Sequence, residues 1–181
     1  WGLVVWIDDS ILQSYQEGDT LTNLTQGIGD PEGKVFYMEN GLRRWVVDRP
    51  TFDAWNFDVN LISDIPNIFL LRYPTGYNIS RLATTRGDSR VYWIESGAKR
   101  WIISGAVFNA WGLDWASICW VSTSLLNRLT SGNNITNFAT DGFDNFYIVD
   151  LGQKRKASES ILAALGFNPA DAITSNLLSF L

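Results

Sequence analysis

Acidic and arginine side chains recur at one fixed spacing along this chain. The pairs are Glu39 with Arg44, Glu95 with Arg100, and Asp150 with Arg155. An arginine can hold a carboxylate through two parallel hydrogen bonds, or offer the same donors to a sugar hydroxyl or a ligand carboxylate. The spacing therefore predicts either an ion pair that fixes a local turn or a polar socket for a ligand, repeated along the chain.

Aromatic residues accompany two of these pairs. Tyr37 and Trp93 lie two residues before the glutamates, and Trp45 and Trp101 directly follow the arginines. Rings at such positions either pack in a core or form a stacking platform for sugar rings. Because Lys156 stands where the first two copies have tryptophan, we expect Trp45 and Trp101 to be at least partly exposed.

The residue types argue against catalysis. The chain has no histidine, and Cys119 is its one cysteine, so it lacks an imidazole base, a Ser-His-Asp triad and a thiolate zinc site. Two carboxylates suffice to hydrolyse a glycoside, but the acidic candidates come in equivalent sets, which suits architecture or multivalent binding better. We expect a noncatalytic protein without metal or cofactor, and a small buried side chain at Cys119.

The overall composition limits the partners. The 181 residues include 14 basic and 19 acidic ones, for a net charge of −5, which disfavours nucleic acid or an anionic membrane as the main partner. No apolar run is long enough to span a bilayer. Asn23, Asn78 and Asn134 begin N-glycosylation acceptor patterns. Turn chemistry repeated at Asn78 and Asn134 explains the last two equally well.

The paired residues lie in segments that repeat. Residues 35–55 read VFYMENGLRRWVVDRPTFDAW, residues 91–111 read VYWIESGAKRWIISGAVFNAW, and a more divergent copy begins at Phe146. Asn-Gly between two apolar runs predicts a β-hairpin with a two-residue loop. In that hairpin Phe36 lies opposite Trp45 on one face, and Tyr37 lies opposite Arg44 on the other.

Shorter elements follow each predicted hairpin. A helix is expected at 50–55 and at 106–111, and glycine follows the helix at Gly112 and Gly166. After it we expect a short apolar strand, a turn at Ser63 or Ser122, and a second short helix that ends at Gly76 or Gly132.

These elements predict an α+β fold made of tandem β-hairpin and short-helix units in a single domain, 1–181. Repeat 1 spans 33–80, repeat 2 spans 89–136, and a truncated repeat 3 spans 144–181, in a compact pseudo-symmetric or solenoid-like arrangement. Residues 1–24 form a half-unit, because Trp6 to Leu12 matches Trp120 to Leu126. We expect this half-unit to close against the last unit of the same molecule, which gives a disc, or to pair with the next molecule, which gives a fibre.

The repeat resembles the tandem units of about 50 residues in secreted and surface-attached bacterial proteins. The residues that carry the likeness are the aromatic hairpin with its arginine and tryptophan, the FxAWG-like helix and the GxNI(S/T) end. In layout it is similar to the LGFP repeat, with LGFNP at Leu165 to Pro169. The resemblance implies an extracellular, noncatalytic module that holds surface or cell-wall polysaccharide.

The sequence thus favours a secreted repeat protein that binds carbohydrate through equivalent sites on successive units. Trp45 and Trp101 would stack on sugar rings, and Arg44, Arg100, Glu39 and Glu95 would bind hydroxyls, flanked by Tyr37 and Trp93. Several linked weak sites would raise the apparent affinity. The alternative is a structural subunit of an extracellular filament or sheath that assembles head to tail through its terminal half-units.

Overall fold

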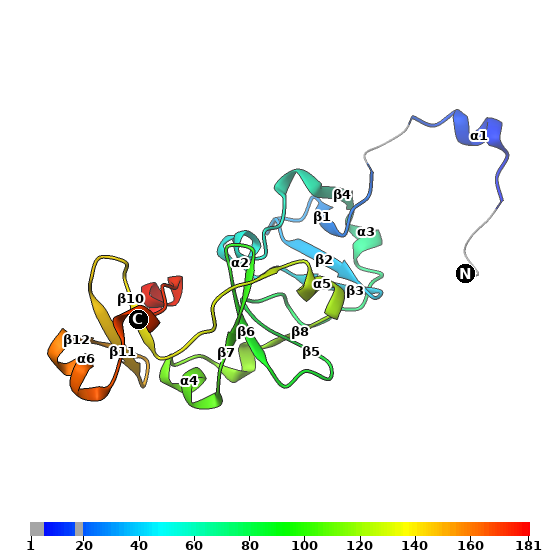
Figure 1. The fold of residues 1–181 in the computed structure, drawn as a ribbon. Coiled ribbons are helices and arrows are strands. Elements are labelled where there is room, and N and C mark those ends of the chain that lie inside the picture. Colours follow the sequence, from blue (N-terminus) through cyan, green and yellow to red (C-terminus); the bar gives the residue numbers. More distant parts are fainter. Residues whose placement is uncertain (1–5, 17–19) are drawn as a thin grey trace.

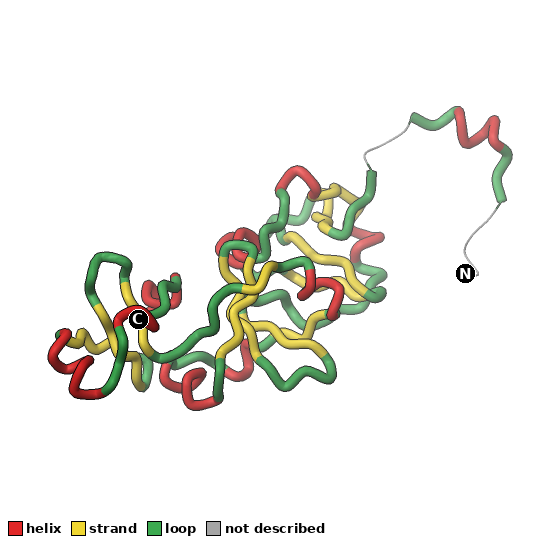
Figure 2. The backbone as a smooth tube through the Cα atoms, in the orientation of Figure 1, coloured by secondary structure: helices red, strands yellow, loops and turns green. Residues whose placement is uncertain are grey.

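The computed structural model describes residues 6–16 and 20–181, and these residues form an α+β fold (Figure 1). The predicted α+β class is confirmed. Within the described residues the strands form three small sheets. The sheets follow one another along the molecule, with short helices and loops between them (Figure 2).

The first sheet has the strand order β3-β2-β1-β4. Its elements in chain order are β1 (Leu24–Ile28), β2 (Val35–Glu39), β3 (Leu42–Trp45), the helix α2 (Arg49–Ala54), the 3-10 helix η1 (Val59–Leu61), β4 (Ile62–Pro66) and the helix α3 (Asn67–Leu70). Strand β1 pairs antiparallel with β2 and parallel with β4.

The second sheet has the order β8-β5-β6-β7-β9. Its elements are β5 (Leu82–Thr85), β6 (Val91–Glu95), β7 (Ala98–Ile102), α4 (Gly105–Ala110), η2 (Trp115–Ser117), β8 (Cys119–Val121), α5 (Thr123–Asn127) and β9 (Thr130–Ser131). Strand β5 pairs antiparallel with β6 and parallel with β8, as β1 pairs with β2 and β4 in the first sheet.

The third sheet has the order β10-β11-β12. Its elements are β10 (Phe138–Thr140), β11 (Phe146–Asp150), β12 (Gln153–Ala157), α6 (Glu159–Leu165), η3 (Pro169–Asp171) and η4 (Asn176–Phe180). Ala139 also forms a parallel bridge with Ile173, on the side of β10 that faces away from β11.

Three hairpins have the register that the sequence predicts. We call β2–β3 hairpin 1, β6–β7 hairpin 2 and β11–β12 hairpin 3. Phe36 pairs with Trp45 in hairpin 1, and Tyr92 pairs with Trp101 in hairpin 2. The loop residues Asn40 and Gly41 both have positive φ, 52° and 74°. A two-residue loop with both residues left-handed matches the right-handed twist of the strands, which is why Asn-Gly predicted it.

The helix after each hairpin also confirms the prediction, to within one residue at each end. Helix α2 begins after Asp48, whose carboxylate accepts a hydrogen bond from the Thr51 amide at 2.7 Å. Helix α4 begins after Ser104, whose hydroxyl accepts from the Val107 amide at 3.2 Å. These side chains satisfy amide groups that the first helical turn leaves free.

The predicted turn at Ser63 is wrong. Ser63 lies inside β4, opposite Thr25 of β1, and the helix α3 begins only after Pro66. Ser122 does cap α5, as expected. Neither second helix extends to the predicted glycine, since α3 ends at Leu70 and α5 ends at Asn127. The two serines are not at equivalent positions, because Ser63 takes the place of Cys119 and Pro66 takes the place of Ser122.

The buried apolar residues form two clusters, and the second sheet contributes to both. Tyr92 and Ile94 belong to the first cluster with residues of the first sheet, whereas Trp93 and Ile102 belong to the second cluster with residues of the third sheet. Successive residues of a strand point to opposite faces. Sheet two is therefore buried on both faces, between its two neighbours.

The predicted half-unit falls partly on residues 1–5 and 17–19, which lie outside the described residues. The described part contains α1 (Asp9–Gln13), and Asp8 caps this helix as Ser122 caps α5. Every residue from 6 to 16 is exposed, and we call this segment the arm. The arm lies beyond the first sheet, while hairpin 3 lies at the opposite end of the molecule (Figure 1).

Candidate functional site

The arginine of hairpin 1 joins three parts of the chain. The Arg44 guanidinium donates to the Glu39 carboxylate at 2.7 Å and to the Tyr77 carbonyl at 2.9 Å. It also donates to the Trp120 carbonyl, in the edge strand β8 of the second sheet. The Ser122 amide completes the arrangement by donating to Glu39 at 3.4 Å. This ion pair therefore holds the segment 119–127 against hairpin 1.

Hairpin 2 repeats this arrangement with the last part of the chain. The Arg100 guanidinium pairs with Glu95 and donates to the carbonyls of Asn133 and Thr174, at 2.7 Å and 2.6 Å. The Asn176 amide donates to Glu95 at 3.1 Å. Residues 172–180 thus lie on hairpin 2 as residues 119–127 lie on hairpin 1.

Two further hydrogen bonds complete the Glu95 site. The Ser175 hydroxyl donates to the Glu95 carboxylate at 2.9 Å, and the Trp93 indole donates to it at 3.1 Å. A buried charge is costly unless it is paired and hydrogen-bonded. Glu95 meets this condition, because it has four donors and is 7 % exposed.

Hairpin 3 has an acidic residue and an arginine at the places of the ion pairs in hairpins 1 and 2, but no described segment of the chain covers them. Asp150 and Arg155 are both exposed, and the Arg155 guanidinium donates only to the neighbouring Gln153 side chain, at 3.4 Å, among the described residues. None of the ion pairs found within 6–16 and 20–181 involves a basic side chain of β12, and the Lys154 ammonium donates to the Leu178 carbonyl at 2.9 Å. Hairpin 3 therefore offers the same carboxylate and guanidinium groups as hairpins 1 and 2, but without a described segment bound to them.

The structure does not gather the predicted sugar-binding residues into one site. Five of these residues are buried: Tyr37, Trp93, Arg44, Arg100 and Glu95. The side chains of Arg44, Arg100, Trp93 and Glu95 form hydrogen bonds with other protein groups. The Glu39 side chain is only 11 % exposed. Direct contact of these residues with sugar stays a prediction, and their burial counts against it.

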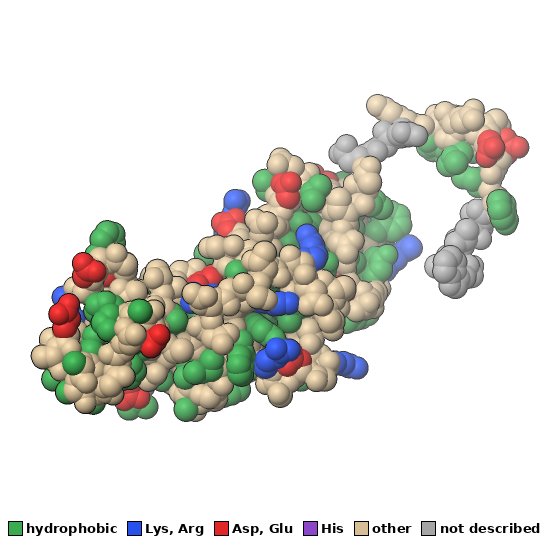
Figure 3. All heavy atoms as spheres, in the orientation of Figure 1, with side chains coloured by type: hydrophobic (Ala, Val, Ile, Leu, Met, Phe, Trp, Pro, Cys, Tyr) green, Lys and Arg blue, Asp and Glu red, His purple; other side chains and the backbone are tan. Residues whose placement is uncertain are grey.

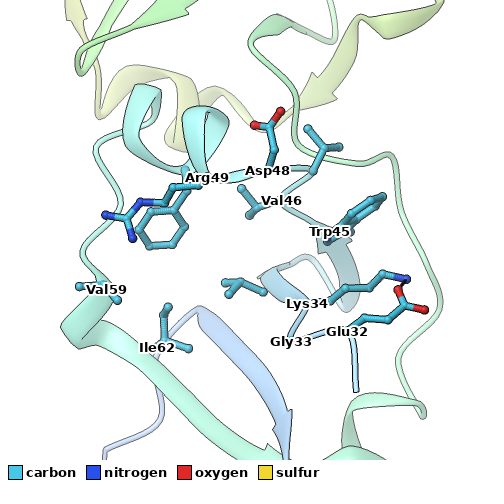
Figure 4. Close-up of a pocket in the computed structure, with 12 residues that line it drawn as sticks. Glu32, Gly33, Lys34, Trp45, Val46, Asp48, Arg49, Val59 and Ile62 are labelled. Carbon is cyan, nitrogen blue, oxygen red and sulfur yellow. Dashed lines mark ion pairs between the residues drawn. The ribbon is translucent and has the colours of Figure 1, made fainter. Parts of the chain in front are cut away.

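Trp45 differs from Arg44, because adjacent strand residues face opposite ways. It is partly exposed and lines a cavity of about 400 Å³ between hairpin 1 and α2. Figure 4 shows Trp45, Lys34 and Glu32 along one wall of this cavity, and Arg49, Val59 and Ile62 along the other. We call it the Trp45 cavity. It combines an aromatic wall, an apolar floor and charged groups at the rim.

A capped turn positions the charged wall of the Trp45 cavity. The Asp30 carboxylate accepts hydrogen bonds from the amides of Glu32 and Lys34, at 3.1 Å and 3.2 Å. The Lys34 side chain then pairs with Glu32 and lies over the Trp45 ring, with its ammonium group 5.1 Å from the ring centroid. An ammonium group over an indole is attracted by the ring electrons.

The matching region beside hairpin 2 is filled. Trp101 is partly exposed but packs against the first apolar cluster. Trp115, in the place of Val59, stacks on Phe108 with ring centroids 4.0 Å apart. Its ring also lies 3.7 Å from where a Cβ of Gly105 would be. Two differences therefore accompany the closed space: Trp115 replaces Val59, and Gly105 replaces Arg49, whose guanidinium lies over the Phe52 ring at 5.7 Å from its centroid.

The charged wall has its own counterpart beside hairpin 2. The Arg90 guanidinium binds both carboxylate oxygens of Asp88, at 2.9 Å and 3.1 Å. These hydrogen bonds lower the pKa of Asp88 to about 2. Tyr92 adds a hydrogen bond to the same carboxylate at 3.2 Å.

Cys119 is 2% exposed, which confirms the prediction of a small buried side chain at this position. Burial raises the pKa of its thiol.

Sequence reasoning missed the residues that shape the Trp45 cavity. Lys34 and Val59 lie outside the hairpin motif, and their signal was available in the repeat, where Arg90 and Trp115 occupy the same places. The predicted glycan acceptors Asn23, Asn78 and Asn134 are all exposed, and their modification stays a prediction.

Comparisons with known proteins leave the family open. No family model and no curated protein sequence matches the chain. One similar solved structure is the periplasmic assembly from the ESX-5 inner membrane complex, with 9% identity and a TM-score of 0.27. The match covers 87% of this chain and 58% of that one, so this chain spans little more than half its length. In the part of the chain that the structure describes, none of the helices is long and apolar enough to cross a membrane.

Proposed function

We propose that this chain is a noncatalytic extracellular module of tandem repeats that binds carbohydrate in the Trp45 cavity. The observation that supports a ligand site is the open space of about 400 Å³ beside a partly exposed tryptophan. Ligand sites of this size are typically apolar, with a few convergent polar groups. Trp45 would stack on the apolar face of a sugar ring, and Lys34, Glu32 and Asp48 would bind its hydroxyls.

The repeat itself is part of the proposal. Three hairpins share one register, each is followed by a capped helix, and two are covered by a later segment through the same hydrogen bonds. This supports three copies of one unit in a solenoid-like row. The resemblance to secreted bacterial surface repeats supports an extracellular location, with surface or cell-wall polysaccharide as the ligand class.

The proposed site belongs to the first unit alone rather than to every unit. Trp115 occupies the matching space in the second unit, and Lys156 stands in the place of the tryptophan in the third. We therefore propose one sugar site per chain, and we assign Arg44, Glu39, Arg100 and Glu95 to holding units together.

Filling the cavity tests the carbohydrate proposal. We expect Val59→Trp to weaken glycan binding by more than about tenfold, or about 1.4 kcal/mol, because its larger ring would occupy the cavity that Val59 lines. Trp45→Ala should lose a similar amount through the missing stacking surface. The measurement is a glycan array followed by calorimetric titration of the hits.

The control variant is Val59→Ala, which leaves the cavity open and should bind as the wild type does. Glycans that bind Val59→Trp and wild type equally would contradict the site. If no glycan of the array binds wild-type protein, the carbohydrate function itself is wrong.

The second candidate function is a structural subunit that assembles head to tail in an extracellular filament or sheath. The observation that favours it is the arm, in which Trp6, Ile11, Leu12 and Tyr15 are exposed by 101%, 52%, 56% and 72%. Apolar side chains exposed together along one segment are typical of a surface that packs on a partner.

Removal of residues 1–19 tests this second function. We expect the wild-type chain to gain mass with concentration in light scattering, and the shortened chain to stay monomeric. Because the arm buries no side chain, its removal should leave the free energy of unfolding of the monomer unchanged within about 0.5 kcal/mol. A wild-type chain that is monomeric at every soluble concentration would rule out assembly.

A further inference from the structure

The arm has the same local structure as a segment that covers a hairpin elsewhere in the chain. Helix α1 spans five residues after the cap Asp8, and α5 spans five residues after the cap Ser122. With these caps aligned, Trp6 matches Trp120, and Ile11 and Leu12 match Leu125 and Leu126. The two leucines of α5 are 2% and 4% exposed, whereas the two matching arm residues are half exposed.

Covering a hairpin requires little from the covering segment besides its backbone. The carbonyls of Trp120 and Thr174 accept from Arg44 and Arg100, and the amides of Ser122 and Asn176 donate to the paired glutamates. The spacing from carbonyl to amide is two residues in both cases. In the arm the same spacing falls on the Trp6 carbonyl and the Asp8 amide.

We propose that the arm of one molecule covers hairpin 3 of a second copy of this chain. In this contact Arg155 would donate to the Trp6 carbonyl of the other copy, and the Asp8 amide would donate to Asp150. Ile11 and Leu12 would pack over Ile148, which takes the place of Tyr37 in hairpin 1. The inference rests on the second candidate function and assigns its contact.

Charge supports this pairing of surfaces. The arm contains Asp8 and Asp9 and no basic residue, while the exposed Arg155 lies on the face of hairpin 3 that the arm would cover. Lys154 and Lys156 lie on the opposite face, where Lys154 donates to the Leu178 carbonyl at 2.9 Å. Figure 3 shows acidic and apolar side chains exposed together on α1. Opposite charges on two surfaces steer association and disfavour wrong partners. The exposed Arg155 is therefore suited to an acidic, apolar segment.

The geometry of the molecule selects a second copy over the same chain. Hairpin 3 and α1 lie at opposite ends of the row of sheets (Figure 1). An arm that covers hairpin 3 of another molecule leaves that molecule's own arm free, so the contact is heterologous and propagates. The described part of the half-unit, residues 6–16, is exposed throughout and does not close against the last unit as the predicted disc requires.

Two complementary variants of the full chain test the contact. Ile11→Asp with Leu12→Asp disables the arm, and Arg155→Glu disables hairpin 3. Each variant alone should be monomeric in light scattering. An equimolar mixture should form a complex with twice the mass of the chain, because the first variant keeps hairpin 3 and the second keeps the arm.

The matched control is Arg86→Glu, an exposed arginine on a loop of the second sheet, which should assemble as the wild type does. Assembly that persists in Arg155→Glu would overturn the contact while keeping the assembly function. A mixture that stays monomeric, although the wild type assembles, would also overturn it. A monomeric wild type would remove both. Circular dichroism checks that each variant is folded.

Discussion

Arg100→Ala should lower the free energy of unfolding by about 3–5 kcal/mol, the cost of breaking a buried ion pair by removing one partner. Glu95 would remain buried at 7 % exposure without its arginine. The carbonyls of Asn133 and Thr174 would also lose their donor. Urea denaturation followed by tryptophan fluorescence measures the change.

Arg155→Ala is the matched control for this variant. Arg155 has the same place in hairpin 3 but is exposed, so its loss from the monomer should cost less than about 0.5 kcal/mol. Equal losses for the two variants would mean that the arginine acts within its own hairpin and not through the segment above it. Glu95→Ala combined with Arg100→Ala should cost less than the sum of the single variants, because no unpaired charge is left.

Phe108→Ala should cost about 3–5 kcal/mol, the range for removing a buried phenylalanine ring. Phe108 is 1% exposed, and Trp115 covers its ring at a centroid distance of 4.0 Å. The substitution would leave a cavity in the second cluster and remove this stacking contact. Thermal or urea unfolding of the single variant measures the loss.

Phe52→Ala is the matched variant in the first unit and should cost less by about 1 kcal/mol. Phe52 is 5% exposed and already borders the open Trp45 cavity, so its removal enlarges a space that water reaches. Aromatic pairs add about 0.5–1.5 kcal/mol beyond the area they bury, and Phe52 lacks the close stack of Phe108. Losses of equal size would contradict the contrast between a filled and an open space.

The sequence predicted those features that local geometry determines. Asn40 and Gly41 specify a loop of two left-handed residues, and this loop sets the register of every residue in hairpin 1. The position of the helix after the hairpin follows from the cap Asp48 and from Pro50. Both signals lie within a few residues of what they specify.

The candidate site was harder to predict, because alternation along a strand separates neighbouring residues. The register that places Tyr37 opposite Arg44 also places Trp45 on the other face, so a joint tryptophan and arginine site was inconsistent with the predicted hairpin. The hairpin therefore places its tryptophan on one face and its arginine on the other. The pairing Glu39–Arg44, weighed from the sequence as an ion pair, does form.

The contact between units left no local signal. Arg44 reaches the Trp120 carbonyl across 76 residues, and any residue at that position offers the same backbone oxygen. The difference between Val59 and Trp115 was visible in the repeat. Its meaning depended on the ring of Phe108 lying beneath, which only the tertiary structure provides.

Native-state hydrogen exchange of the Arg44→Ala and Arg100→Ala variants tests most directly whether each ion pair holds a later segment against its hairpin. The prediction is that Arg44→Ala speeds amide exchange in residues 119–127, and that Arg100→Ala speeds it in residues 172–180, each well above wild type. Arg155→Ala should change neither segment. Faster exchange confined to the variant's own hairpin, with the distant segment as protected as in wild type, would contradict the account.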